Sequence, residues 1–333
     1  MPDARIALSI GDPAGIGPEI VLKTLTANAE ASRRAIVVGD REPLARHAAA
    51  CAIDVEIGAD ELRWPNGCKT PLVVCNAIGN GGWRFAEAST AGGRACLAYA
   101  TRAIEIAKAG QVNAVLAAPH TETSVNLVKP GFSGYPTLVA ELTQTIPKRV
   151  FLMLLCREFR VLQVTLHLSL RNAIEQISTE LVEAAIEVGH TSLTRFGIAQ
   201  PKIAVCGLNP HAGENGLFGA EDREIIAPAI TNARTRGHDV SGPLAADAAF
   251  AARRHDLYLA MYHDQGHIPV KVVAPFCSSA ITVGTPVVFG TVAHGSAYDI
   301  AGQNRADHRA FANAFELLVD QFCDNRSVER RCG

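Results

Sequence analysis

The sequence predicts an α/β protein built from two α/β/α domains, and three observations support this prediction. Short apolar runs alternate with amphipathic helical segments, a pattern typical of a mostly parallel sheet covered on both faces. The chain has 333 residues, which exceeds the ~250–300 residues at which a single hydrophobic core stops growing. Polar segments follow several apolar runs, at the strand ends where such folds place their chemistry.

The first part of the chain begins with an apolar strand over residues 5–10, followed by a Gly-rich turn over 11–19 and an amphipathic helix from residue 20. Pro18 suits the first helical turn, and Glu19 suits the positive end of the helix dipole. The turn could cradle a phosphate, but it lacks the Gly-x-Gly-x-x-Gly spacing, so a tight turn lining a cleft is preferred. We expect further strands at 35–38, 72–75 and 114–118, and helices at 42–50 and 86–109.

Residues 119–136 are too polar and too rich in Pro and Gly for the interior of an element, and we interpret them as a crossing between domains. The first domain is then expected to comprise residues 1–127 with 276–333, and the second residues 128–275. In the second domain we expect helices at 137–145, 178–196 and 221–236, strands at 149–155, 160–165, 202–208 and 257–261, and a loop at 242–247.

Composition excludes several classes of partner. The net charge is -2 without a basic cluster, which argues against nucleic acid. The longest apolar stretches, such as residues 150–156, are far shorter than the ~20 residues of a membrane span, and the N-terminus has no signal pattern. The nine cysteines are scattered and never spaced as Cys-x-x-Cys, the profile of reduced thiols. These features predict a cytoplasmic protein that acts on a small molecule.

Three histidines, His167, His211 and His263, each follow a predicted strand of the second domain. The last belongs to a polar segment, residues 261–271, that we expect to be a loop at the strand end. Three imidazoles are the minimum set for a catalytic divalent metal with an open position for substrate. Imidazole favours Zn, Co, Ni or Fe(II), whereas Mg would need an oxygen from Asp247 or Asp264. The alternative is three unrelated polar loops around a metal-free cleft.

The segment 293–302 predicts a cofactor site. Two glycines around small residues let a flat ligand approach the backbone, and Asp299 can accept both hydroxyls of a ribose. The same carboxylate would repel a 2′-phosphate, which favours NAD over NADP. We expect His294 to brace this loop, and we leave it out of the metal ligands with His120 and His267. The predicted cofactor contacts are His294, Gly295, Ser296, Ala297, Asp299 and Ile300.

Six motifs resemble those of the 4-hydroxythreonine-4-phosphate dehydrogenase family, over nearly the whole chain; they occupy residues 11–19, 165–171, 206–214, 242–247, 262–266 and 294–297. The resemblance implies a homodimer with the isocitrate/isopropylmalate dehydrogenase-like fold and an active site in the cleft between domains. It implies a metal shared across the dimer by His167, His211 and His263. It also implies NAD-dependent oxidation of a secondary alcohol β to a carboxylate, followed by decarboxylation.

The chain departs from the family at its substrate contacts. It has Gly134-Tyr135-Pro136 where the phosphate-using enzymes have Gly-His-Thr, Ala280 for an Asn, Phe289 for an Arg, and Glu122 for a Lys. Of the basic contacts only Lys271 remains. Each lost charge-assisted contact to a buried anion should cost on the order of 2–5 kcal/mol, so a phosphorylated substrate should bind poorly.

A flatter, more apolar pocket suits a ring, as in the terephthalate cis-dihydrodiol dehydrogenase branch of the family. We therefore predict NAD- and metal-dependent oxidative decarboxylation of a cyclic cis-dihydrodiol carboxylate, of the type that yields protocatechuate. Zinc is preferred, with Co, Mn or Mg as alternatives. Tyr135, Lys271, Ala280 and Phe289 would contact substrate, Lys271 would hold a carboxylate or relay a proton, and Asp247 or Asp264 would orient ligands or take the hydroxyl proton.

Two other functions stay open at this point. The first is oxidation of a phosphorylated hydroxy acid such as 4-phosphohydroxy-threonine by the same chemistry. The second is a metal-dependent binding protein or lyase that keeps the fold without redox turnover. Formation of NADH separates the redox functions from the last one.

Overall fold

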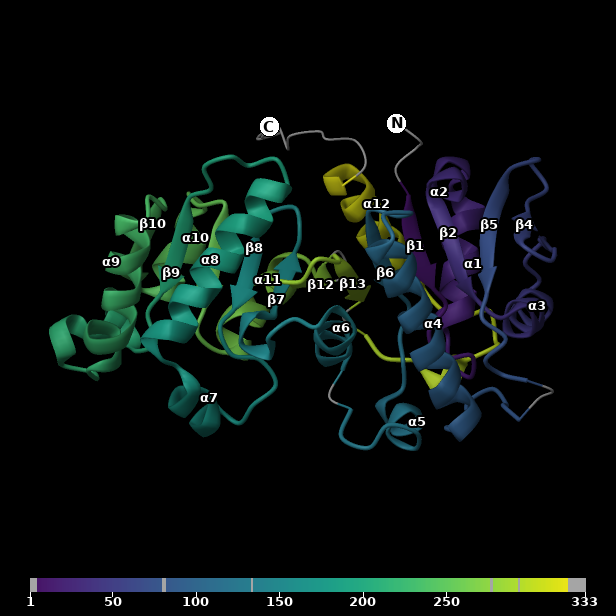
Figure 1. Cartoon of the computed structure of the whole chain (residues 1–333), viewed down its shortest axis with the longest axis horizontal. Helices are drawn as coiled ribbons and strands as arrows, with labels where there is room; N and C mark the ends of the chain where they lie inside the picture. Colours follow the sequence, from purple (N-terminus) through teal and green to yellow (C-terminus); the bar gives the residue numbers. More distant parts are fainter. Residues whose placement is uncertain (1–4, 80–81, 133, 276–277, 293, 323–333) are drawn as a thin grey trace. The chain divides into compact units, whose positions relative to one another are not determined.

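The computed structural model describes residues 5–322 except 80–81, 133, 276–277 and 293. The chain divides into two compact units, Met1–Thr143 with Pro286–Asn325, and Gln144–Thr285 (Figure 1). Both boundaries fall later than residues 127 and 276. Helix α6 (Tyr135–Thr143) places Leu138 and Val139 in the core of the first unit, and strand β12 (Ser279–Val283) pairs with the second unit's β7.

The first unit contains a sheet in the order β13-β6-β1-β2-β5-β4-β3. The strands from β13 to β5 are parallel, and β4 and β3 form an antiparallel edge. The strands near 5–10, 35–38, 72–75 and 114–118 are thus confirmed. The bounds are β1 Ile6–Ser9, β2 Ala35–Gly39, β3 Glu56–Ile57, β4 Glu61–Arg63, β5 Lys69–Val74, β6 Ala114–Ala117 and β13 Phe289–Val292.

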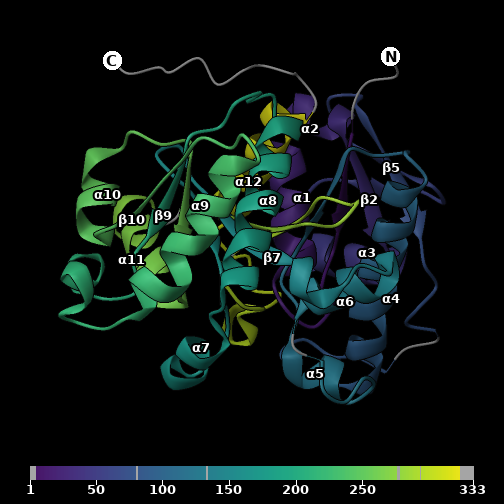
Figure 2. The ribbon, with the colours of Figure 1, turned by 60° about the vertical axis from the view of Figure 1, so that its left-hand side comes forward.

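Helices cover both faces of this sheet, with α4 on one face and α1 and α12 on the other (Figures 1 and 2). Helix α4 begins where the Ser89 hydroxyl accepts a hydrogen bond from the Gly92 amide, 3.0 Å away. Gly93 lets it approach α5 closely, since a Cβ there would lie 2.0 Å from the Ser124 carbonyl oxygen. The bounds are α1 Gly17–Ala27, α2 Ala29–Arg34, α3 Arg41–Ala50, α4 Thr90–Lys108, α5 Glu122–Asn126, η4 Tyr298–Ile300 and α12 Arg309–Phe322.

The second unit contains a sheet in the order β10-β9-β11-β8-β7-β12. The first four strands are parallel, and β7 and β12 are antiparallel to their neighbours. The carboxyl ends of β9, β11 and β8 therefore lie side by side at one edge, and each precedes one of the three histidines. The bounds are β7 Phe151–Leu155, β8 Arg160–Gln163, β9 Ile203–Cys206, β10 Val240–Leu244 and β11 Leu257–Ala260.

Two segments of the second unit differ from the prediction. Residues 261–271 are not a loop, because only two residues separate the end of β11 from α11 (His263–Val273). Residues 242–247 are not a loop either, because they include the end of β10 and the start of α10. Gly266 permits the short connection, since a Cβ there would lie 3.0 Å from both Ala260 and Val161. The remaining bounds are η1 Pro147–Arg149, α7 Leu170–Gln176, α8 Thr179–Arg195, η2 Pro210–Gly216, the π-helical η3 Asp222–Ile226, α9 Ala227–Thr235 and α10 Ala246–Ala252.

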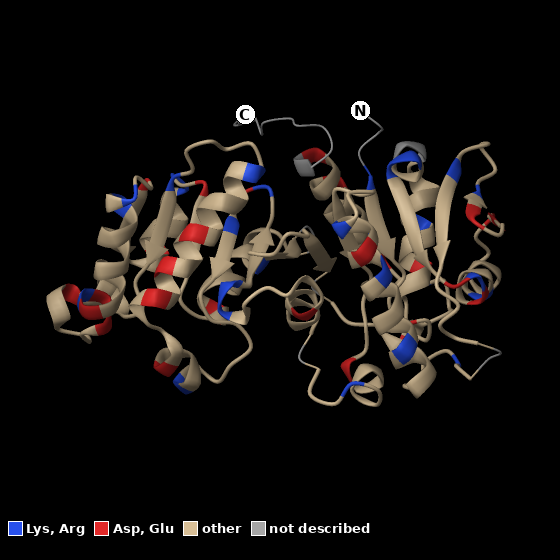
Figure 3. Cartoon of the chain, viewed as in Figure 1, with Lys and Arg blue, Asp and Glu red and all other residues tan. Residues whose placement is uncertain are grey.

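Charged residues of both signs are spread along the helices and loops of each unit (Figure 3). Helix α8 carries three glutamates followed by Arg195 at its end, whereas the charged residues of α4 are mostly basic. Among the helices of the described residues, none combines the length and the apolar character needed to cross a membrane.

Candidate functional site

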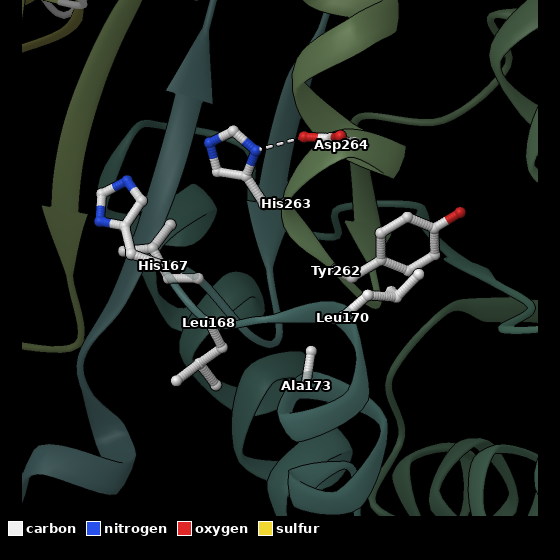
Figure 4. A pocket seen from close by; sticks show the side chains of 8 residues that line it. His167, Leu168, Leu170, Ala173, Tyr262, His263 and Asp264 are labelled. Atoms are coloured by element: carbon white, nitrogen blue, oxygen red, sulfur yellow. Dashed lines mark hydrogen bonds and ion pairs between the residues drawn. The ribbon is translucent and has the colours of Figure 1, made fainter.

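Two of the three predicted ligands, His167 and His263, lie together in the second unit. Their ring centroids are 5.6 Å apart, and both side chains line a cavity of about 330 Å³ at the ends of β8 and β11 (Figure 4). The other lining residues are mostly apolar: Leu166, Leu168, Leu170, Ala173, Tyr262 and Asp264. The cavity therefore presents two imidazoles beside apolar side chains, and it is open to solvent at His167, Leu168 and Leu170.

His263 is oriented by its neighbours. Its Nδ1 lies 2.7 Å from Asp264 Oδ1, and because a carboxylate only accepts, Nδ1 carries the hydrogen and the neutral ring keeps a lone pair on Nε2. Asp264 itself is exposed, with 72% of its side chain accessible. A histidine whose second nitrogen donates to a carboxylate has the arrangement typical of a metal ligand. The residues present thus fit a nitrogen-ligated divalent metal.

His267, which the sequence argument set aside, stacks on His263 with ring centroids 3.7 Å apart. It lies one helical turn further along α11 and contacts the Gln163 side chain through Nδ1. Burial, followed by repulsion from His263 when that ring is protonated, lowers the pKa of His267 to about 4. A neutral His267 stabilises the position of His263 without competing for its proton.

His211 lies elsewhere in this unit. It is exposed on η2, where it and its neighbours up to Asn215 have positive φ angles, and the nearest ring is that of Phe218, 6.4 Å between centroids. In the described part of the chain, only Glu19, His47 and Cys51 form a group of three potential ligands whose atoms lie within 4.8 Å of one another. A single chain thus brings together two of the predicted histidines and not the third.

The segment that carries His211 is fixed by Asp222, which the sequence argument missed. The buried carboxylate accepts from the Leu208 amide (2.8 Å), the Asn209 amide (3.1 Å) and the Asn209 side-chain nitrogen (2.9 Å). A carboxylate 14 residues away in sequence gives no local pattern, so only the folded structure reveals this role.

The predicted acid–base residues lie on helices α11 and α10. Lys271 follows His263 by two helical turns on the same face of α11, and its ammonium donates to the Ser278 hydroxyl over 3.4 Å. Burial lowers the pKa of Lys271, which favours the neutral amine needed by a general base. Asp247 is exposed in the first turn of α10. Among these candidates, Lys271 has the most protected environment.

The predicted cofactor loop belongs to the first unit and is held against the Gly-rich turn. The Ser296 carbonyl accepts from the Ile16 amide (2.9 Å), and the Thr121 hydroxyl donates to the Ser296 hydroxyl (2.8 Å). Ala297 has a left-handed conformation, with φ 42°, that turns the chain into η4. His294, Gly295 and Asp299 are exposed, and a Cβ on Gly295 would meet no atom within 4 Å. The loop therefore presents an open backbone at Gly295 and an exposed carboxylate at Asp299.

A buried polar network joins the same two segments. The Tyr298 hydroxyl donates to Asp12 Oδ2 over 2.7 Å and lies 3.2 Å from the Ser124 hydroxyl. The second Asp12 oxygen accepts from the Ala14 amide (2.9 Å). Asp12 is fully buried, and burial followed by its charge raises the pKa of Tyr298. This network, absent from the predicted site, positions the residue adjacent to Asp299.

The predicted substrate contacts occupy apolar surroundings. Tyr135 and Phe289 are 2% and 1% exposed, their ring centroids are 4.9 Å apart, and both belong to the core of the first unit. The Tyr135 hydroxyl is buried without a hydrogen-bond partner among the described residues. His120 lies against Tyr135, with centroids 4.3 Å apart. Ala280 is buried in the core of the second unit.

The fold and these sites define a mixed α/β protein of the dehydrogenase class. Residues 31–318 match the family model described as pyridoxal phosphate biosynthetic protein PdxA. The chain therefore belongs to the PdxA family, that of 4-hydroxythreonine-4-phosphate dehydrogenase, which confirms the resemblance found in its motifs. Members of this family are dehydrogenases that act on CH–OH groups.

The relatives include enzymes with two kinds of substrate. The chain is 41% identical over 318 residues to a 1,2-dihydroxy-3,5-cyclohexadiene-1,4-dicarboxylate dehydrogenase of Comamonas sp, covering 95% of this chain and 98% of the relative. It is 40% identical to a D-threonate 4-phosphate dehydrogenase of Cupriavidus necator, covering 93% and 94%. The structure of a putative 4-hydroxythreonine-4-phosphate dehydrogenase from Salmonella typhimurium matches with a TM-score of 0.85 at 33% identity, covering 94% and 98%.

Proposed function

We propose that this chain is an NAD- and metal-dependent dehydrogenase that oxidises and decarboxylates a cyclic cis-dihydrodiol carboxylate. The observation that carries the proposal is the contact between Tyr135 and Phe289. By resemblance, these positions hold an anion-binding His and Arg in the phosphate-using enzymes. Here they bury two aromatic rings in apolar surroundings, where a phosphate would lack charged partners. The relative at 41% identity, which acts on a ring diol, supports the same substrate class.

His167 and His263 would hold the metal, with His211 supplied by the partner of a homodimer. When bound, the ion would supply Lewis-acid stabilisation of the developing alkoxide and enolate, worth several kcal/mol. Asp264 would keep the His263 ring in the orientation that leaves Nε2 available. Zinc suits this nitrogen-rich set, and Co, Mn or Mg are alternatives.

Side chains of the protein would accept the proton and bind the substrate. Oxidation moves a hydride from the carbinol carbon to NAD and a proton from the hydroxyl to a base. Lys271, with its lowered pKa, can accept that proton as a neutral amine or, once protonated, hold the substrate carboxylate. The resulting β-keto acid then loses CO2. The electron pair of the broken C–C bond completes the aromatic ring, and the enolate oxygen gains a proton to give the catechol. Asp247 is a further candidate for the base.

The exposed Asp299 carboxylate would accept the two ribose hydroxyls of NAD, and Gly295, Ser296 and Ala297 would approach the adenosine through their backbone. His294 and Ile300 border this segment. A 2′-phosphate would meet the same carboxylate with like charge, which disfavours NADP. We expect a catalytic efficiency at least tenfold higher with NAD, and equal efficiency with NADP would contradict this.

The dimer proposal rests on apolar side chains that solvent would otherwise reach. Leu217 and Phe218, which follow His211 closely, are 73% and 48% exposed. Near the chain's own proposed metal residues, Leu170 of α7, which lines the same cavity, and Ile268 of α11 are 56% and 59% exposed. We propose that a second copy covers these groups and brings its His211 to the site. Phe218→Asp should raise the dimer dissociation constant in sedimentation and weaken metal binding, while the exposed Arg223→Ala should do neither.

The decisive experiment compares substrates. Purified protein with a divalent metal and NAD is given a cyclic cis-diol carboxylate or, in parallel, 4-phosphohydroxy-threonine or D-threonate 4-phosphate, and NADH and CO2 are measured. The proposal predicts NADH and equimolar CO2 from the ring diol, with a kcat/KM at least a hundredfold higher than for the phosphorylated acids. Efficient turnover of a phosphorylated acid alone would refute it.

The second candidate function is oxidation of such a phosphorylated acid. It is favoured by the retained Lys271, a basic contact of the phosphate-using enzymes, and by the relative at 40% identity. Tyr135→His separates the two candidates further, because it restores an anion contact. On the proposal, this variant loses activity on the ring diol.

The metal is tested through His263→Ala, with His190→Ala as a matched control on the surface of the same unit. The first variant should lose turnover and one equivalent of bound metal while keeping its circular dichroism spectrum. Chelator-treated wild type should recover on addition of Zn, Co or Mn. Full activity in metal-free protein would contradict this part of the proposal.

A further inference from the structure

Three potential metal ligands are buried together in the first unit, whereas the residues proposed to catalyse the reaction belong to the second unit. Glu19 lies on α1, and His47 and Cys51 lie at the end of α3. Glu19 and His47 are fully buried, and Cys51 is 2% exposed. His47 and Cys51 are four residues apart and share one face of the helix. One ligand atom from each of the three residues lies within 4.8 Å of the other two.

The hydrogen bonding of His47 leaves one ring nitrogen available. Its Nε2 lies 2.9 Å from the Pro13 carbonyl oxygen, and because a carbonyl only accepts, Nε2 carries the hydrogen. In the neutral ring, Nδ1 then has a lone pair, and this buried atom has no hydrogen-bond partner among the described residues. Burial lowers the pKa of His47, which favours the neutral ring.

Glu19 presents a second acceptor to the same space. Its Oε1 accepts from the Lys23 ammonium (2.6 Å) and from the Ala306 amide (3.0 Å). Its Oε2 is buried without a hydrogen-bond partner in the described structure. Glu19 Oε2 and His47 Nδ1 each have a lone pair, and the weak donor beside them, the Cys51 thiol, can donate a hydrogen bond to only one of the two. A buried polar atom left unpaired costs about 1–3 kcal/mol, so a cation bound to Glu19 Oε2 and His47 Nδ1 would remove this cost.

We propose that Glu19 Oε2, His47 Nδ1 and Cys51 Sγ bind a divalent cation of the zinc class. A set of one sulfur, one nitrogen and one oxygen suits zinc or cobalt rather than calcium or magnesium. The bond from His47 Nε2 to a main-chain carbonyl is the support that ligating histidines usually have. The ion would join α1 to α3 and, through Pro13, fix the Gly-rich turn, so its role would be structural.

Binding requires loss of the thiol proton. Burial, followed by the negative charge of Glu19, raises the pKa of Cys51 to about 11, so the thiol is protonated in the metal-free protein. The ion forms a metal–sulfur bond as the S–H bond breaks, and the proton leaves to solvent. Metal binding should therefore release one proton at neutral pH and strengthen as the pH rises.

Cobalt(II) tests the proposal, because a thiolate ligand gives a sulfur-to-cobalt charge-transfer absorption that an all-histidine site lacks. Metal-stripped full-length protein carrying His263→Ala, which removes the other proposed metal, is titrated with Co²⁺. We expect one equivalent to bind with the charge-transfer band and about one proton released. Cys51→Ser should abolish the band, whereas Cys96→Ser, at a buried cysteine of the same unit, should retain it.

Thermal unfolding gives an independent readout. In the His263→Ala protein, Zn²⁺ should raise the melting temperature, and it should do so when Cys96→Ser is added but not when His47→Gln is added. Absence of the charge-transfer band in the His263→Ala protein, or an unchanged band in Cys51→Ser, would overturn the proposal. Proton release is measured on protein with all three residues intact, so the proposal can fail even if the Cys51 variant does not fold. The catalytic proposal does not depend on these outcomes.

Discussion

Removing the Tyr298 hydroxyl should weaken the structure beneath the cofactor loop. In Tyr298→Phe the fully buried Asp12 loses its 2.7 Å bond from that hydroxyl and keeps the Ala14 amide on its other oxygen. Hydrogen bonds to charged groups contribute about 1.5–3 kcal/mol, so we expect the free energy of unfolding to fall by about 2 kcal/mol. Because the residue adjoins Asp299, we also expect the KM for NAD to rise several-fold while kcat changes little.

Tyr135→Phe is the matched control. Its hydroxyl is also buried in the first unit but has no hydrogen-bond partner among the described residues, so its removal leaves no acceptor unsatisfied. Urea unfolding followed by fluorescence should show a lower midpoint for Tyr298→Phe and an equal or higher midpoint for Tyr135→Phe. Equal losses in the two variants would refute the argument that hydrogen bonding to Asp12, rather than burial of a phenol, stabilises this region.

Three further predictions use other contacts. Gly15→Ala should lower the free energy of unfolding by about 1–3 kcal/mol, because its Cβ would lie 2.7 Å from the Ser296 carbonyl oxygen, whereas Gly295→Ala should not; equal urea midpoints would contradict this. The Asp222 carboxylate accepts three hydrogen bonds from Leu208 and Asn209, in the segment before His211. For Asp222→Asn we therefore expect weaker metal binding by calorimetry and a free energy of unfolding lower by about 1.5–3 kcal/mol. Hydrogen bonds from Arg309 lower the pKa of Asp307 from 3.8 to about 2; the stability lost in Asp307→Asn should be full above pH 4 and vanish as the pH falls through 2, as measured by urea midpoints across pH.

The sequence alone predicted most of the strands, because buried parallel strands are continuous apolar runs that end at Gly, Pro or polar residues. It did not predict that residues 263–273 are helical. Gly266 and Pro269 are poor helix formers, so the local sequence predicts a loop. In the folded chain both residues nevertheless lie in a helix. Gln265 overrides that preference, since its side chain accepts from the Met261 amide and donates to the Gly207 carbonyl, both at 2.7 Å. The second contact joins α11 to a residue 58 positions earlier in the chain, beyond the reach of a local pattern.

That misassigned helix also explains why His267 was set aside and why its relation to the predicted residues His263 and Lys271 was missed. His263, His267 and Lys271 recur every four residues, a spacing that has no meaning in a loop but places three side chains on one face of a helix. Once α11 is recognised, the stacking of His267 on His263 and the protected position of Lys271 follow from the spacing. Contacts between distant segments, such as Tyr298 with Asp12, have no such signature.

The order of the strands in the sheet does not by itself explain the position of His211. Its strand, β9, is a parallel neighbour of β11, so proximity of strand ends alone would bring all three histidines together. The positive φ angles from His211 to Asn215 instead direct the segment outward, and Asp222 fixes its base. A left-handed run of residues with side chains costs about 1–2 kcal/mol per residue, so it persists only where other contacts compensate. Leu217 and Phe218 on this segment are exposed, and in the proposed dimer they would supply apolar surface for a second copy to bury, so dimer formation and completion of the proposed metal site would occur together.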